Sequence, residues 1–210
     1  GKKLMIEEIE GIKVVRTSIY ATKEKSFTKR LRNYLSFTFS SVFTGAKHVG
    51  NQDVVLTESP PLFLGWSGYV ISKKLKAKFV FNISDLWPES AVKLGVLHNK
   101  LLIKASTLLE EYCYRKADAV TGQTKGIVKN IVDRGFDEKK VHLITNGVDT
   151  EFFKKENRDD EFRKSIGIEN KFAACYGGIH GLAQGLEVII NAAEILKDKE
   201  NIQFVFVGDG

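Results

Sequence analysis

The chain has 210 residues, and its 32 Lys and Arg outnumber its 26 Asp and Glu, which gives a net charge of +6. A hydrophobic share of 43% and a charged share of 28% are typical of a globular protein and exclude a disordered or fibrous chain. Two cysteines without a CxxC pair exclude a disulfide framework, and no apolar run approaches the roughly 20 residues of a membrane-spanning helix, so we expect reduced thiols and a cytoplasmic protein.

Short apolar runs alternate along the chain with segments of helical periodicity. Strands are predicted at residues 12–16, 53–57, 78–83, 117–121, 141–144, 172–176 and 203–207. Helices are predicted within 26–49 and at 62–75, 101–112, 124–132 and 182–196. In the third of these, Leu101, Leu108 and Tyr112 share one predicted apolar face. Strands that alternate with helices in this way predict an α/β fold with parallel sheets.

A composition change divides the chain. Charged and polar residues gather at 154–160, which predicts one domain at residues 1–157 and the start of a second at 158–210. The last strand runs directly into Gly208, and the first strand lacks the strand and glycine loop that usually open such a sheet. We therefore expect an internal segment of a longer protein, truncated at both ends.

Ligands of open α/β sheets bind at the carboxyl ends of strands, and the strand at 78–83 is followed there by polar residues. Ser84, Asp85 and Glu89 are therefore candidate site residues, with Asp85 and Glu89 as possible catalytic carboxylates. The alternative for Asp85 is a cap on the helix that follows. Asn146 and Gly147 follow the strand at 141–144, where the alternative is a tight turn with positive φ.

A glycine-rich loop follows the strand at 172–176, and a second one ends the chain. Glycines let backbone N–H groups approach a phosphate, and the helix that follows adds positive potential. If the strands at 172–176 and 203–207 are neighbours, the two loops lie side by side, as a nucleotide or diphosphate site requires. The candidate residues are Gly177, Gly178, His180, Gln184, Gly208, Asp209 and Gly210.

Basic and aromatic residues are interleaved near the N-terminus. Lys23, Lys25, Lys29, Arg30 and Arg32 alternate with apolar residues, and lysines recur at 73–78. A basic amphipathic helix can lie on an anionic membrane, and the alternative is a core helix with a solvated charged face. We recognise no nucleic-acid-binding module. The four histidines have no ligand spacing, and no Asp-x-Asp occurs, so no metal site is predicted.

Five segments carry a family resemblance in their order along the chain. They are 85–90 (DLWPES), 117–121 (ADAVT), 146–153 (NGVDTEFF), 177–186 (GGIHGLAQGL) and 207–210 (VGDG). Their series resembles the family-four retaining glycosyltransferases of the GT-B fold, in particular enzymes of bacterial surface-polysaccharide synthesis.

The resemblance implies two Rossmann-like domains that face each other across a cleft. The N-terminal domain would receive a polyprenyl-linked or saccharide acceptor, with Ser84, Asn146 and Gly147 in the cleft and Lys25, Lys29, Arg30 and Arg32 toward the membrane. The C-terminal domain would hold a nucleotide-diphosphate sugar through the two glycine loops, with no metal and no other cofactor.

Many family members carry Arg and Lys where Gly178 and Gln184 stand, and His where Ser84 stands. Backbone N–H groups would therefore contribute more of the diphosphate binding here. The expected function is retaining, hexosyltransferase-like glycosyl transfer in cell-surface polysaccharide synthesis, in the cytoplasm at the inner membrane face. We expect the 210 residues alone to be inactive. The alternative is a non-catalytic fragment that binds a membrane or a partner.

Overall fold

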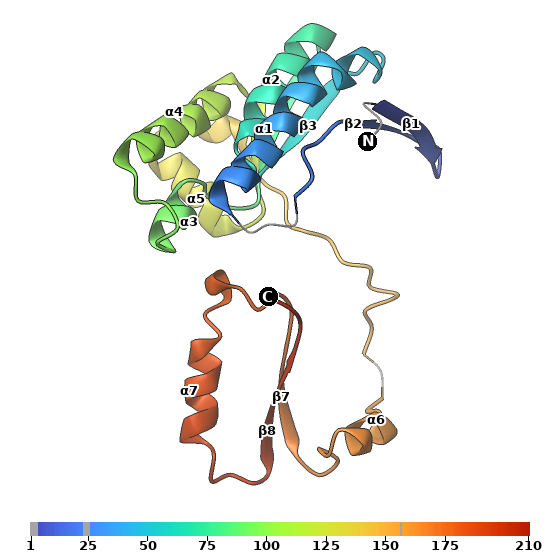
Figure 1. Cartoon of the computed structure of the whole chain (residues 1–210), viewed down its shortest axis with the longest axis vertical. Helices are drawn as coiled ribbons and strands as arrows, with labels where there is room; N and C mark the ends of the chain where they lie inside the picture. The colour runs from blue at the N-terminus through green and yellow to red at the C-terminus, as the bar shows by residue number, and fades with distance from the viewer. Residues whose placement is uncertain (1–3, 23–25, 156) are drawn as a thin grey trace. The chain divides into compact units, whose positions relative to one another are not determined.

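The computed structural model describes residues 4–22, 26–155 and 157–210 (Figure 1). The chain folds as two compact units, Gly1–Gly147 and Val148–Gly210. Among the described residues, no helix is both long enough and apolar enough to span a membrane.

A four-stranded sheet is the centre of the first unit. The elements of the first unit in chain order are β1 (Leu4–Ile9), β2 (Ile12–Thr17), α1 (Phe27–Phe43), η1 (Gly45–Lys47), β3 (Val54–Ser59), α2 (Phe63–Leu75), β4 (Lys78–Ile83), α3 (Glu89–Lys93), α4 (Lys100–Lys116), β5 (Ala119–Gly122), α5 (Lys125–Asp133), η2 (Glu138–Lys140) and β6 (Val141–Leu143). The sheet order is β3-β4-β5-β6, and every pair is parallel. The predicted parallel α/β arrangement is therefore confirmed.

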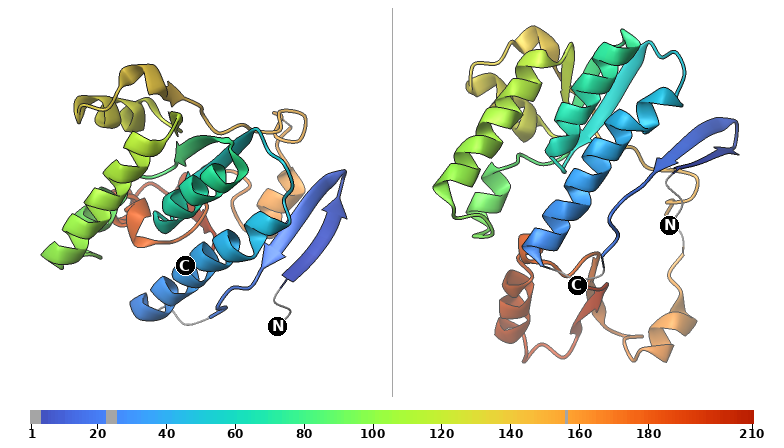
Figure 2. Two further views of the ribbon diagram at one scale, coloured as in Figure 1. Left: turned by 90° about the horizontal axis from the view of Figure 1, so that it is seen from above. Right: turned by 45° about the horizontal axis from the view of Figure 1, so that its top comes forward.

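The core of this unit lies on one face of the sheet. Side chains alternate between the faces of a strand, so Phe79, Phe81 and Ile83 of β4 all point to the same side, where they are buried. Cys113 of α4 and Ile131 of α5 complete the same cluster. Helix α1 packs against α2, alongside which it runs in Figure 1 and Figure 2.

Two features of the first unit differ from the expectation. Strands β1 and β2 form an antiparallel hairpin, of which the sequence predicted only the second strand. The predicted apolar face of α4 is also wrong in part. Leu101 and Leu108 are 79% and 54% exposed, whereas Glu110 is only 3% exposed. The buried side of the helix instead carries Cys113 and Tyr114 together with Glu110, whose carboxylate has partners there.

The second unit contains a two-stranded parallel sheet. Its elements are α6 (Asp160–Ser165), β7 (Phe172–Gly177), η3 (Leu182–Gln184), α7 (Glu187–Ile195) and β8 (Ile202–Val207), and β7 pairs with β8. The single helix predicted at 182–196 is interrupted at Gly185, whose φ of +57° is left-handed. A right-handed helix cannot continue through that conformation, so η3 and α7 are separate. The division of the chain at Gly147 and the predicted boundary at residue 157 both fall between β6 and α6.

Candidate functional site

Four polar side chains lie at the carboxyl edge of the first unit's sheet, one at each strand. Glu58 stands near the end of β3, Ser84 and Gln123 follow β4 and β5 directly, and Asn146 follows β6. We refer to Glu58, Ser84, Gln123 and Asn146 as the polar row. Because the strands are parallel and adjacent, all four residues meet at one edge.

Hydrogen bonds connect the polar row from end to end. The Ser84 hydroxyl donates to Glu58 Oε1. Gln123 Nε2 donates to Ser84 Oγ at 2.5 Å and lies 3.4 Å from Glu58 Oε1. Asn146 Nδ2 donates to Gln123 Oε1 at 3.3 Å. The row therefore presents a preorganised set of amide, hydroxyl and carboxylate groups, which suits recognition of a ligand rich in hydroxyl groups.

The structure brings together two of the predicted cleft residues and adds two others. Ser84 and Asn146 belong to the polar row, whereas sequence reasoning missed Glu58 and Gln123. The signal that drew attention to Ser84, a polar residue where a predicted strand ends, also applies to both missed residues. The tight-turn alternative at Asn146 and Gly147 is wrong, since neither residue has a positive φ.

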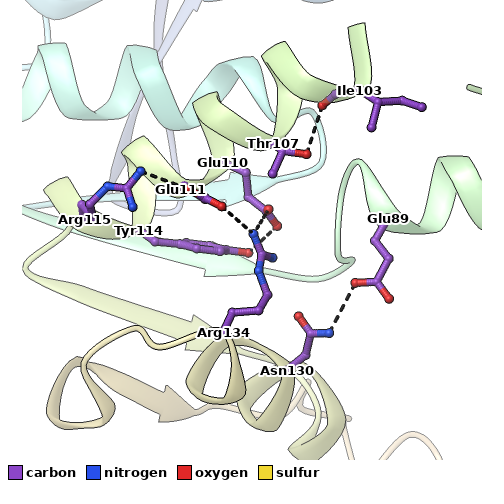
Figure 3. Close-up of polar contacts among 9 residues, drawn as sticks. All are labelled: Glu89, Ile103, Thr107, Glu110, Glu111, Tyr114, Arg115, Asn130 and Arg134. Atoms are coloured by element: carbon purple, nitrogen blue, oxygen red, sulfur yellow. Dashed lines mark hydrogen bonds and ion pairs between the residues drawn. The ribbon is translucent and has the colours of Figure 1, made fainter. Parts of the chain in front are cut away.

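The two candidate carboxylates are held by local partners. Asp85 Oδ2 accepts a hydrogen bond from Ser90 Oγ at 2.9 Å, and no side chain caps the N-terminus of α3. Glu89 Oε1 pairs with Lys93 Nζ at 2.5 Å. Asn130 Nδ2 donates to Glu89 Oε2 at 3.3 Å (Figure 3). Among the described residues, neither carboxylate has a hydrogen bond to the polar row.

The environment of Glu89 stabilises its charged form. The hydrogen bond from Lys93 lowers the pKa of Glu89 below its ordinary value of 4.5, and it outweighs partial burial, which acts in the opposite direction. A carboxyl group whose pKa is lower in the folded than in the unfolded protein stabilises the folded state at pH values above its pKa in the unfolded state. This stabilisation is lost as the pH falls through the pKa in the folded state. Glu89 is therefore ionised at neutral pH. This state suits a general base or a group that stabilises positive charge, whereas a general acid must be protonated.

We expect the Glu89 carboxyl to titrate below pH 4.5, and Lys93→Met to raise its pKa because the main stabilising partner is removed. Carbon NMR of the side-chain carboxyl measures both values. The matched control is Lys129→Met, which removes the same charge from another i,i+4 pair, with Asp133, and should leave Glu89 unchanged. An equal response to the two substitutions would contradict the assignment.

A buried ion pair joins α4 to α5 near the start of β5. Arg134 Nη2 lies 2.7 Å from Glu110 Oε2, and the Tyr114 hydroxyl donates to Glu110 Oε1 at 2.8 Å (Figure 3). Burial, reinforced by the Glu110 charge, raises the pKa of Tyr114 well above its usual range. Arg134 directly follows the last residue of α5, so the pair connects the end of that helix to α4.

The two glycine loops of the second unit lie against each other, as the sequence predicted. Gly178 N donates to Val207 O at 2.9 Å, and His180 N donates to Asp209 O at 3.0 Å, so the pairing of β7 and β8 continues into both loops. A Cβ atom added at Gly208 would lie 1.8 Å from Gly178 O. Only glycine permits this approach. Since the N–H groups of Gly178 and His180 are used between the loops, a ligand would have to bind other donors there.

The His180 ring has an unused polar atom. It packs against the rings of Tyr176 and Phe206, at centroid distances of 5.9 Å and 6.2 Å. Its Nε2 is buried, and no described residue donates to it or accepts from it. A buried ring nitrogen without a partner is costly, which fits a position completed by a ligand or a water. Gln184 lies in η3, between Gly181 and Gly185.

The basic residues of the α1 region have different environments. Lys23 and Lys25 lie outside the described residues. The Arg32 guanidinium stacks over the Tyr20 ring at 4.3 Å, so it has a local structural role, while Arg30 lines an apolar pocket. Within the described residues, no group of three or more His, Cys, Asp or Glu side chains could hold a metal ion.

Comparison with known families identifies residues 5–147 as a glycosyl transferase 4-like domain. Among curated sequences, the chain is 27% identical over 209 residues to WcaI of Escherichia coli (strain K12), which is named as a colanic acid biosynthesis glycosyl transferase. It is 26% identical over 179 residues to WbjE of Pseudomonas aeruginosa, assigned as a glycosyltransferase. These alignments cover 96% and 84% of this chain but 51% and 44% of the relatives, so the chain spans about half the length of either.

Solved structures show the same fold. Anabaena Alr3699/HepE in complex with UDP-glucose matches 88% of this chain and 45% of its own, with a TM-score of 0.59 and 16% sequence identity. The structure of the same protein with UDP and glucose matches 90% of this chain and 46% of its own, also with a TM-score of 0.59. The GT-B fold expected from the sequence is confirmed by this likeness.

Proposed function

The chain belongs to the glycosyl transferase 4-like domain family, and from this membership we propose that the protein containing it transfers a sugar from a nucleotide-diphosphate donor to an acceptor hydroxyl. The family is the one that the sequence predicted. Cell-surface polysaccharide synthesis is the process we propose, because one relative is assigned to colanic acid biosynthesis.

The observation that carries the donor side of this proposal is the close contact of the two glycine loops. They follow β7 and β8 at the carboxyl ends of two neighbouring parallel strands, where nucleotides bind in open α/β sheets. A similar fold has been solved with UDP-glucose. The proposed donor-binding residues are Gly177, Gly178, His180, Gln184, Gly208, Asp209 and Gly210. Neither Gly178 nor Gln184 carries a charge, so the start of α7 and the remaining backbone N–H groups would stabilise the diphosphate.

On the acceptor side, the polar row supports the binding of a sugar or lipid-linked sugar through its hydroxyl groups. We propose that the acceptor hydroxyl attacks the face of the donor from which the diphosphate leaves, so that the anomeric configuration is retained. The main catalytic contribution would be positioning together with stabilisation of charge on the leaving diphosphate. Asp85 and Glu89 remain candidates for catalytic groups, and no metal or other cofactor is required in this scheme. The proposed location is the cytoplasm, at the inner face of the membrane.

The decisive experiment incubates the whole protein with UDP-, GDP- and dTDP-linked sugars and a short saccharide acceptor, and follows the anomeric proton by NMR. We expect transfer with retained configuration from one of these donors, and no turnover by the 210-residue chain alone. An inverted product would refute the retaining mechanism. Absence of transfer with all donors, combined with membrane or partner binding, would favour the non-catalytic alternative.

Gln123→Ala is expected to lower kcat/KM of the whole protein about tenfold, the equivalent of one lost hydrogen bond of about 1.4 kcal/mol. The side chain connects Ser84 and Glu58 to Asn146, so its removal breaks the polar row at the middle. The matched control is Gln52→Ala, since within the described part of the chain the Gln52 side chain donates only to the Val49 carbonyl in its own loop. Equal kcat/KM values for the two variants would show that the polar row does not take part in the reaction.

A further inference from the structure

We propose that a pocket at the amino edge of the first unit's sheet binds a nucleoside monophosphate. The pocket lies where β5 and β6 begin, between the end of α4 and the loop that follows α5. The polar row lies at the opposite edge, where the strands end, so this second site does not depend on the proposed function. The volume of the pocket, about 290 Å³, is at the lower end of the range for small-molecule sites.

The floor of the pocket consists of buried side chains. Tyr114, Val120 and Val141 line it and are 3%, 2% and 7% exposed. Val120 and Val141 are paired across β5 and β6, and all three residues belong to the core cluster of the first unit. A ligand that enters the pocket therefore meets an apolar surface already fixed by the core, which favours a ligand that contains an apolar ring.

One wall of the pocket combines an aromatic ring with two guanidinium groups. The Cζ atoms of Arg115 and Arg134 lie 5.9 Å and 5.7 Å from the centroid of the Phe136 ring. The Tyr114 ring meets the Phe136 ring edge to face, at a centroid distance of 5.0 Å. Aromatic rings and planar guanidinium groups are the two kinds of side chain on which nucleobases stack, so this wall suits a base.

Ion pairs hold both guanidinium groups of this wall in position. Arg115 Nη2 lies 3.1 Å from Glu111 Oε2, and Arg134 Nη2 lies 3.7 Å from Glu111 Oε1 (Figure 3). Arg134 also pairs with the buried Glu110. Glu111 lines the pocket, and its charge is compensated by these two cations. The wall therefore needs little reordering when a ligand binds, which favours affinity.

Two other charged side chains of the pocket, Asp137 and Lys140, form no ion pair with any described residue. Asp137 Oδ1 accepts a hydrogen bond from Lys139 N at 3.0 Å, which leaves Oδ2 for another donor. The Lys140 ammonium group matches a phosphate, and the Asp137 carboxylate matches a hydroxyl or a base N–H group. A simple anion would be repelled by Asp137. A nucleoside monophosphate carries a ring, hydroxyl donors and an anionic group, so it matches the wall, the carboxylate and the ammonium group together.

NMR of the backbone amides can locate the bound nucleotide. We expect uridine monophosphate (UMP), added to the 210-residue chain, to shift the signals of Gly135 and Phe136 in a saturable way. Uridine, which lacks the phosphate, and inorganic phosphate, which lacks the ring, should bind there at least about fivefold more weakly. Equal affinity for either of these two compounds would overturn the proposal. Shifts confined to Gly178 and His180 would also overturn it, because UMP would then bind only at the glycine loops.

Two neighbouring lysines provide matched variants. Lys140→Met removes the ammonium group that lines the pocket, and it should weaken UMP binding at Gly135 and Phe136 about fivefold. Lys139→Met removes the same charge from a side chain that does not line the pocket, so the affinity should stay unchanged. Both lysines are exposed, so both variants should keep the fold, which the other amide signals report. Equal affinities of the two variants for UMP would overturn the proposal.

Discussion

Arg134→Met is expected to lower the free energy of unfolding of the first unit by about 3 kcal/mol. The substitution leaves the Glu110 carboxylate 3% exposed and without its cation, while the Tyr114 hydroxyl alone still donates to it. The loss of the guanidinium stacked beside Tyr114 and Phe136 adds to the cost. Urea unfolding followed by tryptophan fluorescence measures this change, because Trp66 and Trp87 both lie in the first unit.

Arg115→Met is the matched control for that prediction. Arg115 pairs with Glu111 on α4, and the Arg115 side chain is 59% exposed. Loss of this pair should therefore change the free energy of unfolding by no more than about 0.5 kcal/mol. The double variant Glu110→Gln with Arg134→Met should recover part of the lost stability, since no buried charge then remains unpaired. If Arg134→Met and Arg115→Met unfold at the same urea concentration, the Glu110–Arg134 pair contributes no more to stability than the exposed Glu111–Arg115 pair.

The second large effect is expected at Gly208. A methyl group there would meet Gly178 O at 1.8 Å and His180 Nε2 at 3.0 Å, and a backbone oxygen cannot move aside as a flexible side chain can. Gly208→Ala should therefore separate the two glycine loops at a cost of about 3 kcal/mol. In the whole protein, if the loops hold the donor as proposed, that cost corresponds to about a hundredfold loss of UDP-sugar affinity.

Hydrogen exchange tests the structural part of this prediction independently of any ligand. The amides of Gly178 and His180 donate across the loops, so their exchange should become faster in Gly208→Ala. Gly177→Ala is the control, because its Cβ would have no neighbour within 4 Å, and both amides should keep their protection. Unchanged exchange in Gly208→Ala would mean that the loops tolerate the methyl group.

The parallel strands were predictable because each is a short apolar run between polar turns. The contact of the glycine loops followed from the expectation that β7 and β8 are neighbours. The polar row was only half predictable. Ser84 and Asn146 carried motifs, whereas Glu58 and Gln123 offered only their position after a predicted strand. The sheet order then places the ends of β3 and β5 on either side of Ser84.

The orientation of α4 was not predictable from periodicity. Leu101 and Leu108 fit an apolar face, yet the buried side of the helix includes Glu110. The charge of this buried carboxylate is neutralised by Arg134, which is 24 residues further along the chain and directly follows α5. Hydrophobic periodicity is read from one helix at a time. It therefore cannot predict that a charged residue is buried because a residue elsewhere in the chain neutralises it.

The hydrogen bonds of the polar row all run in one direction, from Asn146 through Gln123 and Ser84 to Glu58. The series ends on a carboxylate, whose Oε2 accepts no hydrogen bond from any described residue. That end can bind a group that brings its own proton, and it repels one that brings negative charge. If the row binds the acceptor as we propose, a hydroxyl can donate to Glu58 whereas a phosphate oxygen would be repelled there, so this end of the row would orient a ligand that carries both groups.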